Sequence, residues 1–454
     1  MSLRPRFSTL LATALALSMT ALLVAAILLG RSAEPDGRTV VTVRLWDEQV
    51  ATAYRQSFAE FSRENPDIEV RVNVVAYATY FDTLRTDVAG GSADDIFWLS
   101  NAYFAGYADG GRLMNIEKTL GPSAADAGLP GSAGVAWEPS VVDQFTRDGV
   151  LWGIPQLTDA GIAVYFNADL VEAAGVDLTQ LVALRWSPGG DDTLRPLLAR
   201  LTVDANGRRA DQPGFDPRRV RQWGYNAAND LQGIYLNYIG SAGGVFSDGD
   251  RFAFDNPASA EAFEYLVRLI NEDHVAPPAS DTNSNSDFSR NQFLQGRMAL
   301  FQSGTYNLAA IAEQSRFHWG VVMLPAGPAG RVSVTNGIAA AGNSASKHPD
   351  AVRRVLAWMG STRGNQHLGA RGAAVPAVLA AQRVYFDYWA RRGIDVGPFF
   401  TVLNGPRIPA PGGPGFAAGY QALQPYFDEM FLGRADVDSS LADAQAAANA
   451  AAER

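Results

Sequence analysis

The sequence predicts an α/β fold divided into two domains, and three observations support this prediction. Extended and helical patterns alternate from residue 40 to residue 99, which is typical of parallel sheets with right-handed crossovers. The chain has 454 residues, more than one domain usually contains, since domains span roughly 100–200 residues. The stretch 149–170 holds two extended segments that meet at a polar joint and continue into a short helix.

The chain begins with an uncharged apolar segment at residues 7–30, preceded by Arg4 and Arg6 and followed by Arg31. A membrane-spanning helix needs about 20 apolar residues, whereas the apolar core of a signal peptide has roughly 7–15. We therefore expect residues 1–37 to be a hydrophobic helix and a linker. This helix would anchor the protein to the cell membrane with its N-terminal arginines inside and the rest extracytoplasmic. Signal cleavage and secretion is the alternative.

Composition excludes several classes of function. The net charge is −10, and the first 31 residues contain three arginines and no acidic residue, so the remainder carries −13. Such an acidic body argues against nucleic-acid binding, which needs a basic surface. The chain has no cysteine, which rules out disulfides, thiol catalysis and cysteine-based metal sites.

The first part of the predicted sheet consists of strands at 40–45, 68–75 and 95–99, with helices at 51–63 and 80–88 between them. This order predicts parallel pairing. Ligands in such sheets bind beyond the carboxyl ends of the strands. The residues at these ends are Trp46, Asp47, Glu48, Trp98, Leu99, Ser100 and Asn101.

The stretch 149–170 reads GVLWGIPQLTDAGIAVYFNADL. We expect Pro155 to end its first extended run, because proline removes a backbone donor from a central strand. A polar patch containing Gln156 and Asp159 follows, then a strand at 161–166 and a helix capped by Asn167. The residue pattern alone also fits a hairpin or crossover inside one domain.

Further along the chain, the pattern predicts a surface insertion at 177–222 and a last helix, 438–454, that is exposed and partly frayed. The other predicted elements are helices at 223–240, 258–273 and 348–359, and strands at 298–301 and 319–324.

The sequence contains no catalytic motif in its required context. The histidines are His274, His318, His348 and His367. None stands at metal-ligand spacing from another histidine or a carboxylate pair, and there is no G-x-S-x-G motif. A glycosidase needs two facing carboxyl groups, which Asp47 or Glu48 could in principle form with Asp159. We therefore expect a binding protein without catalytic residues, metal or cofactor.

Motifs along most of the chain resemble one family. The joint G-x-x-W-G-I-P … Y-F-N-A-D-L-V-E-A-A-G-V resembles the interlobe crossing of extracellular solute-binding proteins of ABC importers, in the sugar-binding group that includes maltose-binding protein. The other motifs that match this group, in the same order, are VTVRLWD (41–47), DDIFWLSNAYFAGYADGGRLMNI (94–116), FDNPASAEAFEYLVRLIN (254–271), FLQGRMALFQSGTYN (293–307), WGVVMLPAGPAGR (319–331) and KHPDAVRRVLAWMGSTRG (347–364).

The resemblance implies a two-lobe, type II periplasmic-binding-protein-like fold with hinge-crossing strands, preceded by the N-terminal hydrophobic helix. Lobe one would comprise 38–158 and 337–376, and lobe two 159–336 and 377–454. The implied function is the substrate-binding subunit of an ABC transporter. A monomer would capture a sugar or amino sugar between its lobes and deliver it to permease subunits in the membrane.

Sugar binding requires aromatic faces for the apolar side of the ring and planar polar groups for its hydroxyls. The predicted ligand-binding residues are Trp46, Asp47, Glu48, Trp98, Asn101, Tyr103, Gln156, Asp159, Asn229, Ser303, Thr305, Tyr306, Asn336, Gly337 and Arg371, with Asp230, Gln302, Trp389, Phe416 and Tyr420 as further candidates.

The resemblance implies specific roles for four of these residues. Trp98 and Asn101 correspond to a sugar-contacting Trp and Asp, Asp159 to a ligand-binding Glu, and Tyr306 to a stacking Trp. Each also has a structural alternative, which is core packing for Trp98 and Tyr306 and turn capping for Asp159. Asn101 departs from the family pattern, because an amide accepts hydrogen bonds less strongly than a carboxylate.

Two other functions fit the sequence. A protein of the same fold could bind a glycerophosphate-type phosphodiester, with Arg371 anchoring the phosphate. A secreted glycoside hydrolase is the third possibility, with Asp159 as one of its carboxyl groups.

Overall fold

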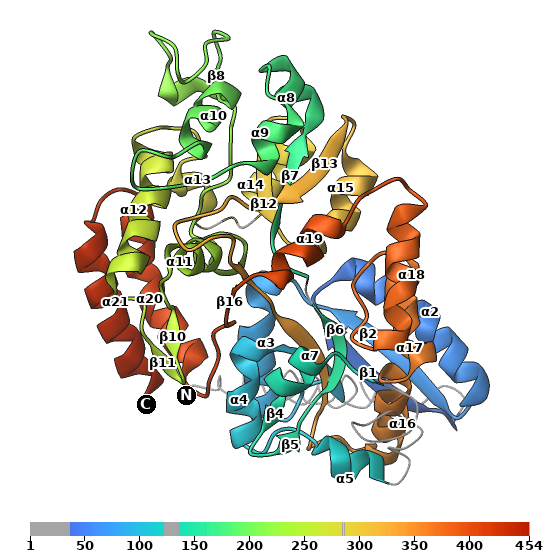
Figure 1. Ribbon diagram of the computed structural model, residues 1–454. Helices are drawn as coiled ribbons and strands as arrows, with labels where there is room; N and C mark the ends of the chain where they lie inside the picture. The colour runs from blue at the N-terminus through green and yellow to red at the C-terminus, as the bar shows by residue number, and fades with distance from the viewer. Residues whose placement is uncertain (1–36, 122–135, 159, 284, 286, 454) are drawn as a thin grey trace, which may run out of the picture.

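The computed structural model describes residues 37–121, 136–158, 160–283, 285 and 287–453. These residues form two lobes, each built around a β-sheet flanked by helices (Figure 1). The predicted N-terminal helix lies in residues 1–36, outside the described part, and stays a prediction. Within the described part, no helix is both long enough and apolar enough to cross a membrane.

Lobe one contains a five-stranded sheet with the strand order β2-β1-β3-β15-β6. β1 pairs in parallel with both β2 and β3, as the sequence predicted, while β15 runs antiparallel to β3 and β6. The strands are β1 (Thr39–Leu45), β2 (Ile68–Val74), β3 (Ile96–Ser100), β6 (Ile154–Thr158) and β15 (Gly337–Gly342), with a small hairpin of β4 (Thr146–Arg147) and β5 (Val150–Leu151) beside them.

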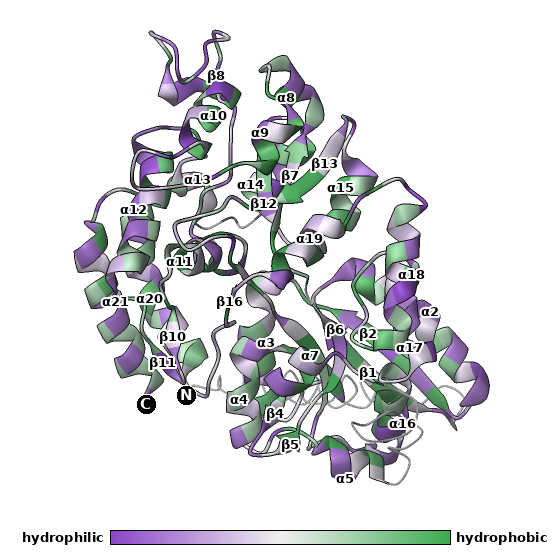
Figure 2. Cartoon of the chain, viewed as in Figure 1, coloured by the Kyte–Doolittle hydropathy of each residue, from purple (hydrophilic) through white to green (hydrophobic). Residues whose placement is uncertain are grey.

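Helices cover this sheet, and all five residues of β3 are buried, as expected for a strand covered on both faces. The helices of lobe one are α2 (Glu48–Glu64), α3 (Tyr77–Gly90), α4 (Asn101–Asp109), α5 (Ile116–Leu120), α7 (Pro139–Gln144), α16 (Pro349–Met359) and α17 (Thr362–Ala370). Figure 2 shows purple, hydrophilic residues along the outer helices and green, hydrophobic residues on many of the strands.

Pro155 differs from its prediction, because it lies inside β6 instead of ending a strand. β6 is the edge strand of the five-stranded sheet, where a residue without a backbone N–H is tolerated. The register between β15 and β6 shifts between Ile338 and Ala339, close to the partner of Pro155. The proline is thus accommodated by its edge position and an irregular ladder.

Lobe two contains a three-stranded antiparallel sheet with the strand order β12-β7-β13. These strands are β7 (Ala163–Asn167), β12 (Leu300–Ser303) and β13 (Trp319–Met323). The shorter strands are β8 (Val203–Asp204), β9 (Val220–Gln222), β10 (Ser247–Asp248), β11 (Arg251–Phe252), β14 (Ser333–Val334) and β16 (Arg407–Ile408).

Helices make up most of lobe two. They are α8 (Ala168–Ala173), α9 (Leu178–Val182), α10 (Leu194–Leu201), α11 (Leu236–Ala242), α12 (Pro257–Asn271), α13 (Ala279–Thr282), α14 (Phe288–Leu294), α15 (Leu308–Gln314), α20 (Phe416–Phe431) and α21 (Val437–Ala452), with the short turns η3 (Pro217–Arg219), η4 (Leu231–Tyr235) and η5 (Thr305–Asn307).

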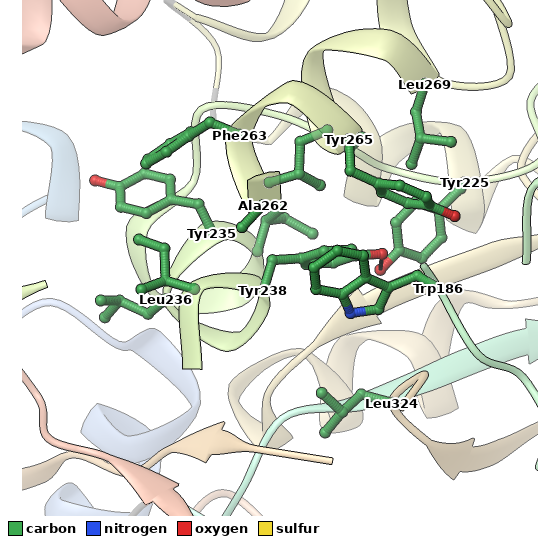
Figure 3. Close-up of a cluster of buried hydrophobic side chains, with 14 of the residues drawn as sticks. Trp186, Tyr225, Tyr235, Leu236, Tyr238, Ala262, Phe263, Tyr265, Leu269 and Leu324 are labelled. Atoms are coloured by element: carbon green, nitrogen blue, oxygen red, sulfur yellow. Dashed lines mark hydrogen bonds between the residues drawn. The ribbon is translucent and has the colours of Figure 1, made fainter. Parts of the chain in front are cut away.

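The core of lobe two is rich in aromatic side chains that also satisfy buried polar groups (Figure 3). The Trp186 indole N–H donates to Ser241 Oγ at 3.0 Å. The Tyr238 hydroxyl donates to the Tyr225 hydroxyl at 3.1 Å, and Tyr225 donates to Gln302 Oε1 at 2.6 Å. Gln302 is fully buried, so this candidate supports the core and is not available to a ligand.

Two helix predictions need correction. Residues before Leu231 in the predicted helix 223–240 are irregular, and helical backbone begins with the π-helical turn η4. Asp230 caps this turn by accepting from the Gly233 N–H at 2.9 Å. The last helix, α21, is not a loose terminal helix, because Leu441, Ala444 and Ala448 are buried in the core of lobe two.

The lobes are connected where the chain passes from β6 to β7 and from β14 to β15. A third connection follows α17 through α18 (Leu379–Ala390), α19 (Gly397–Thr401) and η6 (Val402–Asn404). Ala381 of α18 belongs to the core of lobe one, whereas Tyr385 and Trp389 belong to a separate buried cluster with Tyr165 of β7. α18 therefore packs against both lobes. The exact lobe boundaries stay a prediction.

Candidate functional site

The lobe-one wall of the candidate site is a group of aromatic rings beyond β1 and β2. Trp46 follows β1, and Tyr77 is the first residue of α3, directly after β2. Their ring centroids lie 5.7 Å apart in an edge-to-face arrangement. Tyr77 exposes 57% of its surface, the largest value among the exposed large hydrophobic side chains of the described residues. It is therefore a side chain that a ligand could cover.

Trp98 lies behind this wall and not on its surface. Its side chain is 1% exposed, and its ring packs edge-to-face on Trp46 with centroids 5.0 Å apart. The Trp98 indole N–H donates to the Tyr54 hydroxyl at 3.1 Å, and that hydroxyl donates to Gln156 Oε1 at 2.7 Å. Gln156 is fully buried as well. Trp98 and Gln156, which were predicted to contact the ligand, are thus buried behind the wall and support it.

Asp47 and Glu48 lie at the start of α2, next to Trp46. Asp47 Oδ1 accepts from the backbone N–H groups of Gln49 and Val50 at 2.8 and 3.0 Å and so caps the helix. Burial raises the pKa of Asp47, and these backbone hydrogen bonds act in the opposite direction. Glu48 is exposed and pairs with Arg55 at 2.7 Å.

The lobe-two wall is formed by Tyr306, Asp230 and Tyr420. Tyr306 follows β12 in the turn η5 and is 42% exposed, while Asp230 at the start of η4 is also exposed. Ser303 at the end of β12 and Thr305, the first residue of this turn, are largely buried. Burial raises the pKa of Asp230, with the N–H groups of Gly233 and Gln232 acting to lower it.

A polar group on α20 extends this wall. Asn229 Nδ2 donates to Asp428 Oδ1 at 2.9 Å and to Gln424 Oε1 at 3.4 Å. Asn283 Nδ2 donates to the Asp428 carbonyl at 3.2 Å. Within the described residues, the buried Asn229 Oδ1, Asn283 Oδ1 and Gln424 Nε2 atoms have no hydrogen-bond partner. Burial raises the pKa of Asp428, which favours its protonated form.

Residues of both walls influence the Tyr77 hydroxyl. The pKa of Tyr77 is raised first by burial and then by the nearby Tyr103, Tyr420, Asp230 and Tyr306. Three of these four residues belong to lobe two, although the Tyr77 side chain is largely exposed to solvent. Tyr77 therefore lies near lobe two, while part of its side chain remains accessible to solvent.

The remaining predicted residues have varied positions. Asn101 donates through Nδ2 to the Ala410 carbonyl at 3.2 Å, and the Tyr103 ring stacks on Phe81 with centroids 3.7 Å apart. The Gly337 N–H is occupied by Gln144 Oε1 at 2.7 Å. Among the described residues, no hydrogen bond, ion pair or ring contact connects Asn336 or Arg371 to either wall, and Asp159 lies outside the described part.

Trp389 and Phe416 are core residues, with exposed fractions of 1% and 3%. Sequence reasoning missed Tyr77, Gln424 and Asp428. Tyr77 could have been found, because it follows the carboxyl end of β2, where the same rule had already identified Trp46. Gln424 and Asp428 carried no local signal, since their role depends on contacts with Asn229, far away in the sequence.

Comparison with known proteins connects this architecture to a family. The model of the bacterial extracellular solute-binding protein family matches residues 46–366. The chain belongs to this family. The family consists of binding proteins, in agreement with the prediction that the chain is not an enzyme.

Relatives in this solute-binding family cover most of the chain. UspC of M. tuberculosis has a crystal structure that is 76% identical, covers 91% of this chain and 100% of UspC, and superposes with a TM-score of 0.70. The ABC substrate-binding protein Lmo0181 from Listeria monocytogenes, in complex with cycloalternan, is 19% identical and covers 91% of this chain and 98% of its own, with a TM-score of 0.77.

A curated relative, the maltodextrin-binding protein MdxE of Bacillus subtilis (strain 168), is 23% identical over 303 residues. This match covers 66% of the present chain and 63% of MdxE, so the chain spans less than two thirds of that relative.

Proposed function

We propose that the chain is the extracytoplasmic substrate-binding subunit of an ABC transporter and that it captures a sugar or an amino sugar between its lobes. The proposal depends on one observation, the exposure of Tyr77 in lobe one and of Tyr306 and Asp230 in lobe two, each beyond or beside the end of a strand or helix. Aromatic rings cover the apolar face of a sugar ring, and carboxylate oxygens accept hydrogen bonds from its hydroxyls or its amino group.

The named ligands of relatives support a sugar. MdxE is named for maltodextrin, the Listeria structure contains cycloalternan, and the structure of MalE from Bdellovibrio bacteriovorus, with a TM-score of 0.72, contains maltotriose. The polar group of Asn229, Gln424 and Asp428 offers further donors and acceptors for hydroxyl groups.

Ligand capture would involve rotation of the lobes about their connecting segments. The closed form would dock on permease subunits, and the segment 7–30 would hold the monomer near the membrane.

Isothermal titration calorimetry with a panel of neutral and amino sugars tests the proposal. Tyr77→Ala and Tyr306→Ala should each weaken binding of an identified sugar roughly tenfold, because each removes a stacking face. Tyr426→Ala is the matched control, since Tyr426 is 38% exposed but lies outside the two walls. Normal binding by both cleft variants would contradict the site.

The same titration separates the other hypotheses. Binding of a glycerophosphate that weakens strongly as salt is raised would favour the phosphodiester, because salt screens charge interactions but affects neutral sugars little. Asp159→Ala should weaken sugar binding if Asp159 contacts the ligand as predicted from the sequence. Turnover of a chromogenic glycoside that Asp159→Asn abolishes would favour the hydrolase.

A further inference from the structure

The structure contains a pocket beside the aromatic wall of lobe one, because Phe81, which lines the pocket, packs on both Trp46 and Tyr77. It has a volume of about 310 Å³ and lies between α3, α4 and the residues at the start of α20. Figure 1 shows the segment after β16 passing beside α3 and α4 before α20 begins. Tyr77, Tyr306 and Asp230 do not line this pocket. We propose that it binds a second small molecule, an organic anion with a flat apolar body.

Aromatic rings dominate the pocket wall. Phe81 and Tyr103 are parallel, with ring centroids 3.7 Å apart and an interplanar angle of 12°. Tyr107 and Pro414 also line the pocket, together with aliphatic groups of α3. Pockets that bind drug-sized molecules have volumes of about 300–1,000 Å³ and mostly apolar walls. The size and the wall therefore suit one planar hydrocarbon group.

Two arginines give the pocket a preference for anions. Arg85 and Arg112 line it, against the single carboxylate of Asp82. The Arg85–Asp82 pair is 3.3 Å long and both side chains are more than 60% exposed, so the attraction between them is weak. Arg112 forms no side-chain hydrogen bond or ion pair with any residue in the described ranges. Both guanidinium groups can therefore pair with a carboxylate, sulfonate or phosphate.

Both lobes contribute to the pocket. α3 and α4 belong to lobe one, whereas Gly413, Pro414 and Ala417 are continuous with lobe two. The lobes also touch here through the hydrogen bond from Asn101 Nδ2 to the Ala410 carbonyl. A molecule in this pocket would therefore contact residues from both lobes.

The test uses 8-anilinonaphthalene-1-sulfonate, an apolar aromatic anion whose fluorescence rises in an apolar site. Titration of the full chain should show one saturable site. Ala89→Trp should abolish this site, because Ala89 lines the pocket and is exposed, so its replacement fills the pocket without disturbing the core. The double variant Arg85→Gln/Arg112→Gln should weaken binding about tenfold.

Matched controls separate these effects from unspecific binding. Ala442→Trp places the same side chain on an exposed position of α21, and Arg218→Gln/Arg383→Gln removes two exposed positive charges elsewhere, where each side chain is 88% exposed. Both controls should bind the probe like the original chain. Equal binding by the pocket variants and their controls would overturn the proposal, as would several weak sites with no dependence on Arg85 and Arg112. Failure of sugar binding would not affect this result.

Discussion

Tyr54 joins three elements of lobe one through its hydroxyl. It accepts from Trp98 of β3 and donates to Gln156 of β6, while the residue itself lies on α2. Burial raises the pKa of Tyr54 far above its ordinary value, so the hydroxyl keeps its proton over the physiological range. The cleft-facing Trp46 lies on Trp98, and its position therefore depends on this buried hydroxyl.

Tyr54→Phe should lower the free energy of unfolding by about 1–3 kcal/mol, because it leaves the Trp98 N–H and Gln156 Oε1 buried without their partner. Urea denaturation measures this difference. Tyr426→Phe is the control, since Tyr426 is partly exposed and should lose almost nothing. Equal stability of the two variants would show that the buried network does not stabilise the lobe.

Asp47 caps the N-terminus of α2 with a carboxylate that is partly removed from solvent. Its carboxylate accepts two backbone hydrogen bonds at the start of α2, yet burial raises its pKa above the ordinary value of 3.8. The folded chain thus binds this proton more tightly than the unfolded chain. The contribution of Asp47 to stability therefore decreases as the pH rises from 3.8 through the raised pKa.

Asp47→Ala should cost about 0.5–2 kcal/mol of unfolding free energy, whereas Asp47→Asn keeps the accepting oxygen and should cost little. The Asn variant should also gain stability relative to the original chain as the pH rises above 3.8, because it lacks the buried charge. Urea unfolding at a series of pH values measures both effects. A constant difference between the Asn variant and the original chain would contradict the raised pKa.

At the scale of elements, the turn between α17 and α18 sets how α18 packs between the lobes. Gly372 has a φ of +66°, and a Cβ at this position would lie 2.3 Å from the Tyr388 ring and 2.8 Å from Trp389. Tyr388 and Trp389 belong to α18. Gly372 therefore permits both the backbone conformation and the close approach of the helix.

Gly372→Ala should destabilise the chain more than Gly393→Ala. Both glycines have positive φ, but a Cβ at Gly393 meets no atom within 4 Å. The Gly393 variant should lose about 1 kcal/mol from backbone strain alone, and the Gly372 variant should lose more through its clash with α18. Thermal unfolding of the two variants measures the difference. An equal loss of stability in the two variants would mean that α18 can shift to accommodate the added Cβ without a free-energy cost.

The sequence predicted elements well where one local pattern determined them. The periodicity of 40–99 located β1, β2 and β3, and their parallel pairing was confirmed. The helix expected at 223–240 begins only at Leu231, because Asp230 caps a π-helical turn that periodicity does not reveal. α21 packs in the same core as residues of α20, and the sequence of either helix by itself does not indicate this contact.

The site was only partly predictable for the same reason. The rule that ligands bind at strand ends identified both Trp46 and Trp98 but did not reveal that Trp98 is buried, because its burial depends on packing and on its contact with Tyr54. Tyr306 is exposed, as a stacking residue must be. That Tyr77 and Asp230 influence each other could not be predicted from sequence, because they belong to different lobes and no local pattern shows how the lobes are arranged.

At the scale of the whole molecule, two of the side-chain contacts between the lobes involve exposed groups or ring edges. Gln49 Nε2 donates to Glu313 Oε2 across the opening at 3.4 Å, and both groups are exposed. On another side, Tyr103 of lobe one lies edge-to-face with Phe416 of α20, with centroids 6.0 Å apart. Such contacts are compatible with rotation of the lobes as rigid bodies.

The absence of cysteine from the chain makes this rotation measurable. Arg55→Cys and Gln314→Cys place unique spin labels on exposed positions of α2 and α15, on opposite sides of the cleft. Pulsed electron paramagnetic resonance should show a shorter or narrower distribution of distances between the two labels when a sugar that binds is added. The same labels in a Tyr306→Ala background should not respond at that sugar concentration. Unchanged distances with bound sugar would exclude closure.

The aromatic rings of Trp46, Phe81, Tyr103, Phe416 and Tyr420 form an unbroken series of contacts from one lobe to the other. Trp46 and Tyr420 at its ends belong to the proposed ligand-binding walls, and Tyr103 and Phe416 in its middle form a contact between the two lobes. Engineering that exchanges one of these rings to accept a new molecule would also change the resting angle of the halves. A substitution in this series would therefore affect both the choice of ligand and the angle between the lobes, and variants should be tested for both properties.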